Sequence, residues 1–176
     1  GQMMEKVVLP EQRTRLTDEE VIARCPWATT GRTNGRTPNI ITSLELDPAE
    51  MEKRNIHLQK KYAEIEENEV RFEELHCEDA EYLIVAFGSC ARIAQKAMEI
   101  AREEGIKVGL LRPITLWPFP SKAIAARAAQ VKGILTVELN AGQMVEDVRL
   151  AVECKVPVEH FGRLGGIVPD PDEIVT

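Results

Sequence analysis

Three continuous apolar stretches alternate with segments that have the spacing of amphipathic helices between residues 82 and 161. The apolar stretches are Tyr82–Phe87, Lys107–Leu111 and Gly133–Leu139. Strands that are apolar on both faces are typical of a parallel sheet covered by helices on both sides. The intervening and following segments predict helices at Cys90–Ala101, Ser121–Val131 and Met144–Glu153. Strands separated by helix-length segments predict right-handed βαβ units, and therefore an α/β fold.

Two further strands are predicted on either side of this region. Val70 and Phe72 alternate with polar residues, which indicates a half-buried edge strand at about 70–75. The loop from this strand to Tyr82 is too short for a parallel crossover, so the edge strand should be antiparallel to the others. The final strand is predicted at Val156–Phe161, before a glycine-rich turn. Five strands are therefore expected, with the first antiparallel.

The first 46 residues have few apolar residues at a regular spacing and are predicted to form an extended interdomain arm. Residues 10–38 contain three of the ten prolines and a cluster of turn-forming residues. The capping-box pattern of Thr17 and Glu20 predicts one short helix that ends at Arg24. Trp27 is expected to anchor the arm on a neighbouring surface.

A domain is predicted to follow this arm, over residues 47–176. Asp47 provides a helix N-cap and Pro48 suits the first helical position, so a long helix is expected at 48–67. Residues 169–174 have the pattern of another helix cap and first turn. The first five residues are neither a normal translation start nor a capped element, which favours a segment of a longer polypeptide.

Composition excludes several classes of function. The 176 residues are 44% hydrophobic, enough for one good core. No signal peptide is recognised and no apolar stretch approaches the ~18 residues of a membrane span, so a cytoplasmic protein is expected. Residues 47–80 carry 5 basic and 11 acidic groups, which gives −6 of the net charge of −7. A nucleic-acid-binding surface is therefore not expected, and the acidic segment is either a solvated helix surface or a docking face for a basic partner.

Catalytic and metal-binding residues are not expected in this chain. The four cysteines lie far apart without a CxxC pair, which favours reduced thiols over a disulfide framework and argues against a zinc or iron–sulfur site. Ser89 and Cys90 follow a strand, where an activated nucleophile could lie, but none of the three histidines falls in such a turn. Ser89 is predicted to cap the next helix, and Cys90 to be a small buried thiol.

Two turns are candidates for binding an anion. Gly88 and Ser89 could offer backbone amides at a helix N-terminus, with Arg92 one turn further on. The second turn combines side-chain donors and acceptors with a glycine, in Asn140, Gly142 and Gln143. For the second turn, a left-handed turn with a capping asparagine explains the sequence equally well.

The connector Trp117–Pro120 is rigid and apolar because it alternates aromatic residues with prolines. An exposed connector would mark a subunit interface, and a buried one would only position the helix that follows.

Several motifs together resemble the α subunit of 2-oxoacid:ferredoxin oxidoreductases. The most specific is Gly105–Pro120, which includes the Trp-Pro-Phe-Pro connector, and Val137–Arg149 is a second. Gly1–Glu5 resembles the motif that closes that subunit's first domain, and Pro26–Gly31 resembles its linker. These last two, with Met144–Val148, are closer to the 2-ketoisovalerate members than to the 2-oxoglutarate members. Cys90 departs from the family, which more often has a small hydroxyl or aliphatic residue there, and this argues against a catalytic thiol.

The resemblance implies an enzyme complex that uses thiamine diphosphate with Mg. Such a complex oxidatively decarboxylates a 2-oxoacid and releases an acyl-CoA. The electrons pass through iron–sulfur clusters to ferredoxin. It implies that this chain is the transketolase C-terminal-like domain, a three-layer domain with strand order 1-3-2-4-5 and an antiparallel strand 1. Such a domain is non-catalytic and binds no cofactor itself. Its expected partners are the other subunits of the complex. Coenzyme A and ferredoxin are expected to interact with the complex as a whole. Self-association of the chain is a further expectation.

This strand order locates the expected anion site. It makes the strands that begin at Tyr82 and Gly133 neighbours, so the crevice at their carboxyl ends collects both candidate turns. A carboxylate or the phosphate of coenzyme A would suit it, unless a neighbouring subunit fills the crevice. The remaining alternatives are a domain of a 2-oxoglutarate enzyme and a free-standing anion-binding module.

Overall fold

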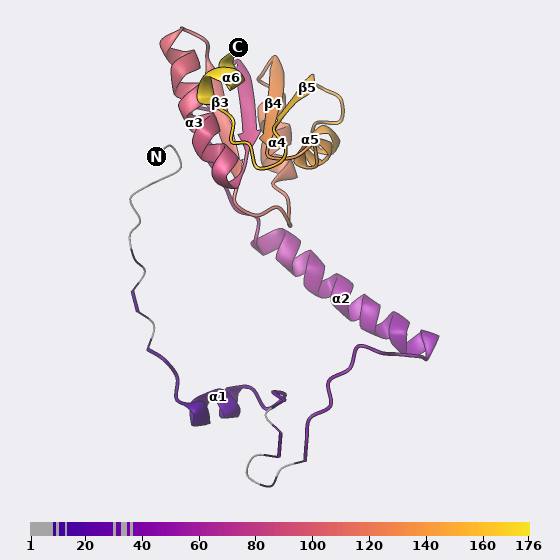
Figure 1. Ribbon diagram of the computed structural model, residues 1–176. Helices are drawn as coiled ribbons and strands as arrows, with labels where there is room; N and C mark the ends of the chain where they lie inside the picture. The colour runs from indigo at the N-terminus through magenta and orange to yellow at the C-terminus, as the bar shows by residue number, and fades with distance from the viewer. Residues whose placement is uncertain (1–8, 10, 13, 30, 33–34, 36) are drawn as a thin grey trace. The chain divides into compact units, whose positions relative to one another are not determined.

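A five-stranded mixed sheet forms the centre of the larger of two structural units (Figure 1). This computed structural model describes residues 9, 11–12, 14–29, 31–32, 35 and 37–176. The strands lie in the order β1-β3-β2-β4-β5. They are β1 (Phe72–Leu75), β2 (Tyr82–Ala86), β3 (Val108–Pro113), β4 (Gly133–Glu138) and β5 (Val158–Gly162).

The pairing confirms the predicted topology. β1 is antiparallel to β3, whereas β3 with β2, β2 with β4, and β4 with β5 are parallel. β1 and β5 each begin two residues later than their apolar patterns predicted. In β5 the reason is Pro157, which lacks the backbone donor that a strand interior needs and whose carbonyl accepts from Ile134 instead.

Helices cover the two faces of the sheet and complete three layers, as expected. α4 (Ser121–Ala128) and α5 (Met144–Val152) pack on one face, where Leu83, Val85 and Leu111 are buried. α3 (Gly88–Glu103) and α6 (Pro171–Val175) cover the other face, against Ile84, Leu110 and Val137 (Figure 1). The core is apolar on both sides because alternate strand residues point to opposite helix layers.

The start of α3 corrects one prediction. Ser89 is not the N-cap of this helix, because Phe87 occupies that position without a side-chain cap. The Ala91 amide donates to the Phe87 carbonyl at 3.2 Å, so the first helical hydrogen bond starts at Phe87. Gly88 follows with φ +55°, which glycine adopts readily. Ser89 lies in the first turn, exposed, while Cys90 behind it is buried as predicted.

The smaller unit spans residues 5–59 and contains α1 (Asp18–Arg24). The predicted capping box is present, with the Thr17 amide donating to Glu20 Oε2 at 2.8 Å and the Glu20 amide to Thr17 Oγ1 at 3.3 Å. Trp27 is 65% exposed within this unit, so its expected role as an anchor stays a prediction. The sequence motif at Gly1–Glu5 lies outside the described residues.

The helix α2 (Pro48–Asn68) runs from this unit into the larger one. It begins at the predicted N-cap, where the Ala49 amide donates to Asp47 Oδ1 at 2.8 Å. No helix in the described part of the chain is long and apolar enough to span a membrane.

A bidentate ion pair holds the edge strand β1 against α4. Arg127 donates from Nε to Glu74 Oε1 at 2.9 Å and from Nη2 to Oε2 at 2.6 Å. Both side chains are largely buried, with 19% and 23% exposed. The hydrogen bonds from Arg127 lower the pKa of Glu74 from its ordinary value. A carboxylate with a lowered folded-state pKa stabilises the fold above its unfolded pKa, and this stabilisation is lost as the pH falls through the folded pKa.

We therefore expect Glu74→Gln to lower the free energy of unfolding by about 1–3 kcal/mol at neutral pH. The difference between the variant and the parent should be smaller at an acid pH below the lowered pKa of Glu74, because the parent carboxylate then takes up a proton. Urea unfolding at both pH values measures it. Glu73→Gln is the matched control, since Glu73 pairs with Arg112 from a side chain that is 52% exposed, and such pairs contribute about 0–1 kcal/mol. A Glu74 effect of equal size at both pH values would contradict this expectation.

Candidate functional site

The carboxyl ends of β2 and β4 bring the two predicted turns to the same edge of the sheet. β2 and β4 are parallel neighbours, with Ala86 opposite Val137 near their ends. Gly88, Ser89 and Gln143 are exposed there, while Arg92, Asn140 and Gly142 are half-buried. This arrangement of the candidate residues was predicted from the expected strand order.

A buried glutamate that the sequence analysis did not select lies at the end of β4. Glu138 is 1% exposed. Its Oε2 accepts hydrogen bonds from the Met144 amide at 2.9 Å, the Gln143 amide at 3.2 Å and Asn140 Nδ2 at 3.1 Å. Its Oε1 accepts from the Val145 amide at 3.0 Å. Glu138 therefore supplies a carboxylate to the N-terminus of α5, where the helix dipole favours a negative charge.

This internal carboxylate changes what the second turn can offer a ligand. The first amides of α5 already donate to Glu138, so an external anion would have to displace it. Asn140 is also engaged, because its Oδ1 accepts from the Gly142 amide at 2.7 Å while its Nδ2 reaches Glu138. These contacts favour the explanation that Asn140 caps a turn over the explanation that it binds a ligand. Gly88 and Ser89, at the start of α3, are both exposed.

His160 of β5 completes the polar cluster around Glu138. Its Nδ1 lies 3.2 Å from Thr136 Oγ1 and 3.5 Å from Glu138 Oε1. Thr136 Oγ1 donates to the Glu159 carbonyl at 3.2 Å. Gly162 packs directly over His160, because a Cβ built there would lie 2.6 Å from Nε2. Glu138 and Thr136 are buried and hydrogen-bonded within the cluster, whereas His160 Nε2 is buried without a hydrogen-bond partner. The bonds of Glu138 to the first amides of α5 position this helix on the sheet.

The thiols of Cys77 and Cys90 are buried and are not activated as nucleophiles. Burial raises the pKa of Cys77 to about 11, and burial followed by the charge of Glu138 raises the pKa of Cys90. A raised pKa disfavours the thiolate, which is the nucleophile and the metal ligand. Across the described residues, no group of three or more His, Cys, Asp or Glu side chains could hold a metal ion.

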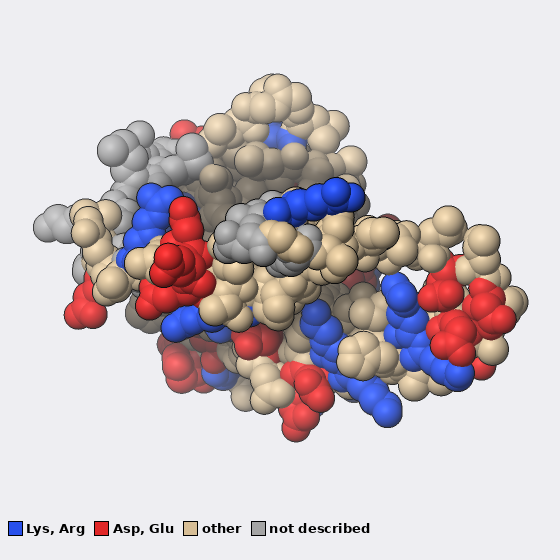
Figure 2. Space-filling model, turned by 90° about the horizontal axis from the view of Figure 1, so that it is seen from below, with Lys and Arg blue, Asp and Glu red and all other residues tan. Residues whose placement is uncertain are grey.

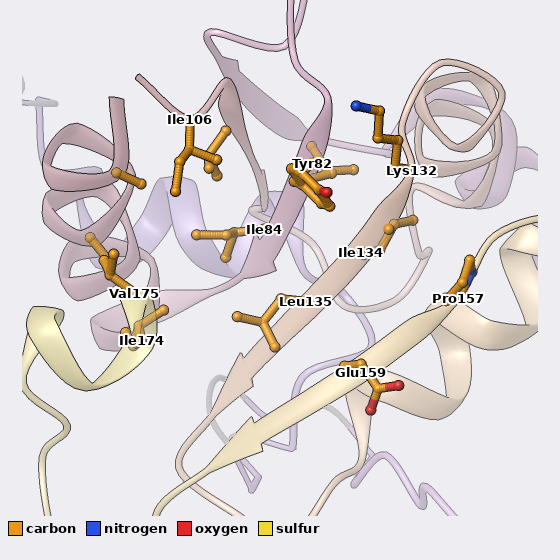
Figure 3. A pocket seen from close by; sticks show the side chains of 15 residues that line it. Tyr82, Ile84, Ile106, Lys132, Ile134, Leu135, Pro157, Glu159, Ile174 and Val175 are labelled. Atoms are coloured by element: carbon orange, nitrogen blue, oxygen red, sulfur yellow. The ribbon is translucent and has the colours of Figure 1, made fainter. Parts of the chain in front are cut away.

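An apolar cavity of about 450 Å³ lies on the α3 face, at the opposite end of the parallel strands (Figure 3). Tyr82, Leu135 and Ile106 line it, together with Ile174 from α6. Lys132 also lines it and pairs with Glu81 outside the cavity lining. This cavity exists because α3 and the five-residue α6 leave part of the sheet uncovered, which no local sequence pattern reveals.

Charge gives no indication of a nucleic-acid site on the face that Figure 2 shows. Lysine and arginine side chains are interspersed there with aspartate and glutamate, and no continuous basic patch is visible.

Comparison with known proteins shows the family to which this chain belongs. Residues 80–174 match the model of the pyruvate:ferredoxin oxidoreductase core domain II. The chain belongs to this family, as its sequence motifs indicated.

Curated relatives extend the similarity to nearly the whole chain. It is 45% identical to the ketoisovalerate oxidoreductase subunit VorB of Methanothermobacter marburgensis and 47% identical to that of Methanothermobacter thermautotrophicus, each over 94% of this chain. The 2-oxoglutarate synthase subunit KorA of Archaeoglobus fulgidus is 30% identical over 97% of the chain. The chain spans about half the length of these relatives, 45% of both VorB sequences and 47% of KorA.

Solved structures confirm the predicted fold. The 2-oxoglutarate:ferredoxin oxidoreductase from Magnetococcus marinus, with 2-oxoglutarate, coenzyme A and succinyl-CoA bound, matches with a TM-score of 0.66 and 25% identity. The match covers 84% of this chain and 27% of that one. A split gene transketolase, an inactive beta4 tetramer, matches at 19% identity with a TM-score of 0.52 and shows the shared fold.

Proposed function

We propose that this chain is the non-catalytic core domain II of a 2-ketoisovalerate:ferredoxin oxidoreductase, a complex that forms acyl-CoA, CO2 and reduced ferredoxin. The supporting observation is the 45–47% identity to two ketoisovalerate oxidoreductase subunits over 94% of the chain. A 2-oxoglutarate substrate is the alternative, supported by a lower identity of 30% over a similar share. In this proposal residues 1–46 serve as an interdomain arm, residues 47–176 form the domain, and the complex is cytoplasmic.

The chemistry of such a complex comes from thiamine diphosphate with Mg and from iron–sulfur clusters. In this proposal those groups are held by other domains or subunits of the complex. The described residues include no cluster of metal-binding side chains, and the thiols of Cys77 and Cys90 have raised pKa values that oppose metal ligation. The carboxylate of Glu138 is enclosed and committed to α5. The proposed role of the chain is therefore assembly with the subunits that carry the cofactors.

An anionic ligand, such as a carboxylate or a coenzyme A phosphate, remains part of the proposal at the start of α3. Gly88 and Ser89 would offer backbone amides, and Arg92 lies one turn further along the helix. Asn140, Gly142 and Gln143 would lie beside this ligand. The amides at the start of α5 would not bind it, since they donate hydrogen bonds to Glu138.

The purified chain is expected to show no reduction of a viologen dye with 2-ketoisovalerate or 2-oxoglutarate and coenzyme A. Addition of the subunits that carry the cofactors should give activity, with a higher kcat/KM for 2-ketoisovalerate. Dye reduction followed by absorbance measures both steps. Turnover by the chain alone would overturn the non-catalytic role, whereas a preference for 2-oxoglutarate in the assembled complex would overturn only the substrate.

A further inference from the structure

A groove separates the C-terminal part of α2 from the Trp117–Pro120 connector, within the larger unit. Its volume is about 960 Å³. Val70, Phe72 and Phe119 form part of its apolar lining, and Trp117 lies along one side. Within the connector Trp117 is 54% exposed, whereas Pro118 and Pro120 are buried and Phe119 is half-buried. Only Trp117 therefore has the exposure that the sequence analysis associated with an interface.

Trp117 is held in place before any partner binds. Its ring meets that of Tyr62 edge to face, with centroids 5.6 Å apart and planes at 85°. Thr115 fixes the preceding turn, since its Oγ1 accepts from the Arg71 amide at 3.0 Å and donates to the Pro118 carbonyl at 2.9 Å. A fixed aromatic side chain loses little conformational entropy on binding, which is typical of residues that dominate interfaces.

The α2 side of the groove carries negative charge. Glu66 and Glu67 line it, and neither forms an ion pair with a described residue. The last turn of α2 has no basic residue, although a helix C-terminus favours cations over carboxylates. Lys122 lines the groove as well and also lacks an ion pair within the described part of the chain. A cation beside Glu66 and Glu67 would therefore satisfy both the carboxylates and the helix dipole.

We propose that this groove binds a segment of a partner protein in which an arginine or lysine stands between apolar side chains. The apolar side chains lie against Val70 and Phe119, and the cation lies over the exposed face of Trp117. The same cation approaches Glu66 and Glu67 at the end of α2. This interaction is independent of which 2-oxoacid the complex uses.

The test uses the full chain with Trp27→Phe, which leaves Trp117 as the single tryptophan of a chain that has two. Its fluorescence is titrated with a blocked peptide Leu-Arg-Leu-Arg-Leu and with the counterpart Leu-Glu-Leu-Glu-Leu. We expect the arginine peptide to bind at least about tenfold more tightly at low salt, and less so as salt screens the charges. The double variant Glu66→Lys, Glu67→Lys should reverse this preference.

The matched control is Glu103→Lys, Glu104→Lys, an adjacent pair of exposed glutamates at the end of α3. It makes the same change in net charge and should leave the preference unchanged. Circular dichroism and the urea midpoint verify that each variant is folded. Equal binding of the two peptides, no binding of either, or an equal loss of preference in the α3 variant would overturn the proposal. Sedimentation that shows a dimer dissociated by Trp117→Ala, without peptide binding, would assign the groove to a second copy instead.

Discussion

Replacing Glu138 by glutamine is expected to lower the free energy of unfolding by about 2–4 kcal/mol, because buried donors lose their acceptor. Glu138 is 1% exposed and accepts from the Met144 and Val145 amides at 2.9 and 3.0 Å. A glutamine amide group has only one acceptor oxygen, so its NH2 group would face at least one of these donors. The N-terminus of α5 would also lose the negative charge that its dipole favours.

Urea unfolding followed by circular dichroism measures this effect. Glu159→Gln is the control, because Glu159 lies on the neighbouring strand β5 and is exposed. The control should change stability by no more than about 0.5 kcal/mol, as is usual for surface substitutions. A Glu138 variant as stable as the control would show that the carboxylate does not hold α5.

Replacing Gly162 by alanine is the second large effect that we expect, with a loss of about 1–3 kcal/mol from overpacking. The added Cβ would lie 2.3 Å from the Asn140 carbonyl oxygen and 2.6 Å from His160 Nε2. The first contact is to backbone, so the end of β5 must move away from the turn after β4. That movement should separate His160 from Thr136, whose Oγ1 lies 3.2 Å from Nδ1.

Gly133→Ala provides the comparison, since its Cβ would make ordinary contact with Tyr82 at 3.7 Å. Its stability should stay within about 0.5 kcal/mol of the parent. Thermal or urea unfolding gives the stability, and the His160 imidazole resonances in an NMR spectrum report the displaced ring. Unchanged stability together with unchanged His160 resonances would show that Gly162 is not required at this close approach.

The sequence by itself determined the α/β class, most helices and the antiparallel edge strand. Apolar periodicity and capping residues are local properties, so the N-caps Thr17 and Asp47 were predicted to the residue. The short loop before Tyr82 required an antiparallel β1, whereas the strand order came from family motifs.

Only the tertiary structure decided the contacts between elements that are distant along the chain. Glu138 stands at the end of an apolar strand, and that unusual position was the available signal, but its bonds to α5 depend on how the following turn folds back. The Ser89 prediction was wrong because the first helical hydrogen bond runs from the Ala91 amide to the Phe87 carbonyl, which places the N-cap two residues earlier. Trp117 could be predicted as rigid but not as exposed, since exposure depends on where Tyr62 of α2 lies. Burial and hydrogen-bond partners are set by packing in three dimensions, and no spacing of residues along the chain encodes them directly.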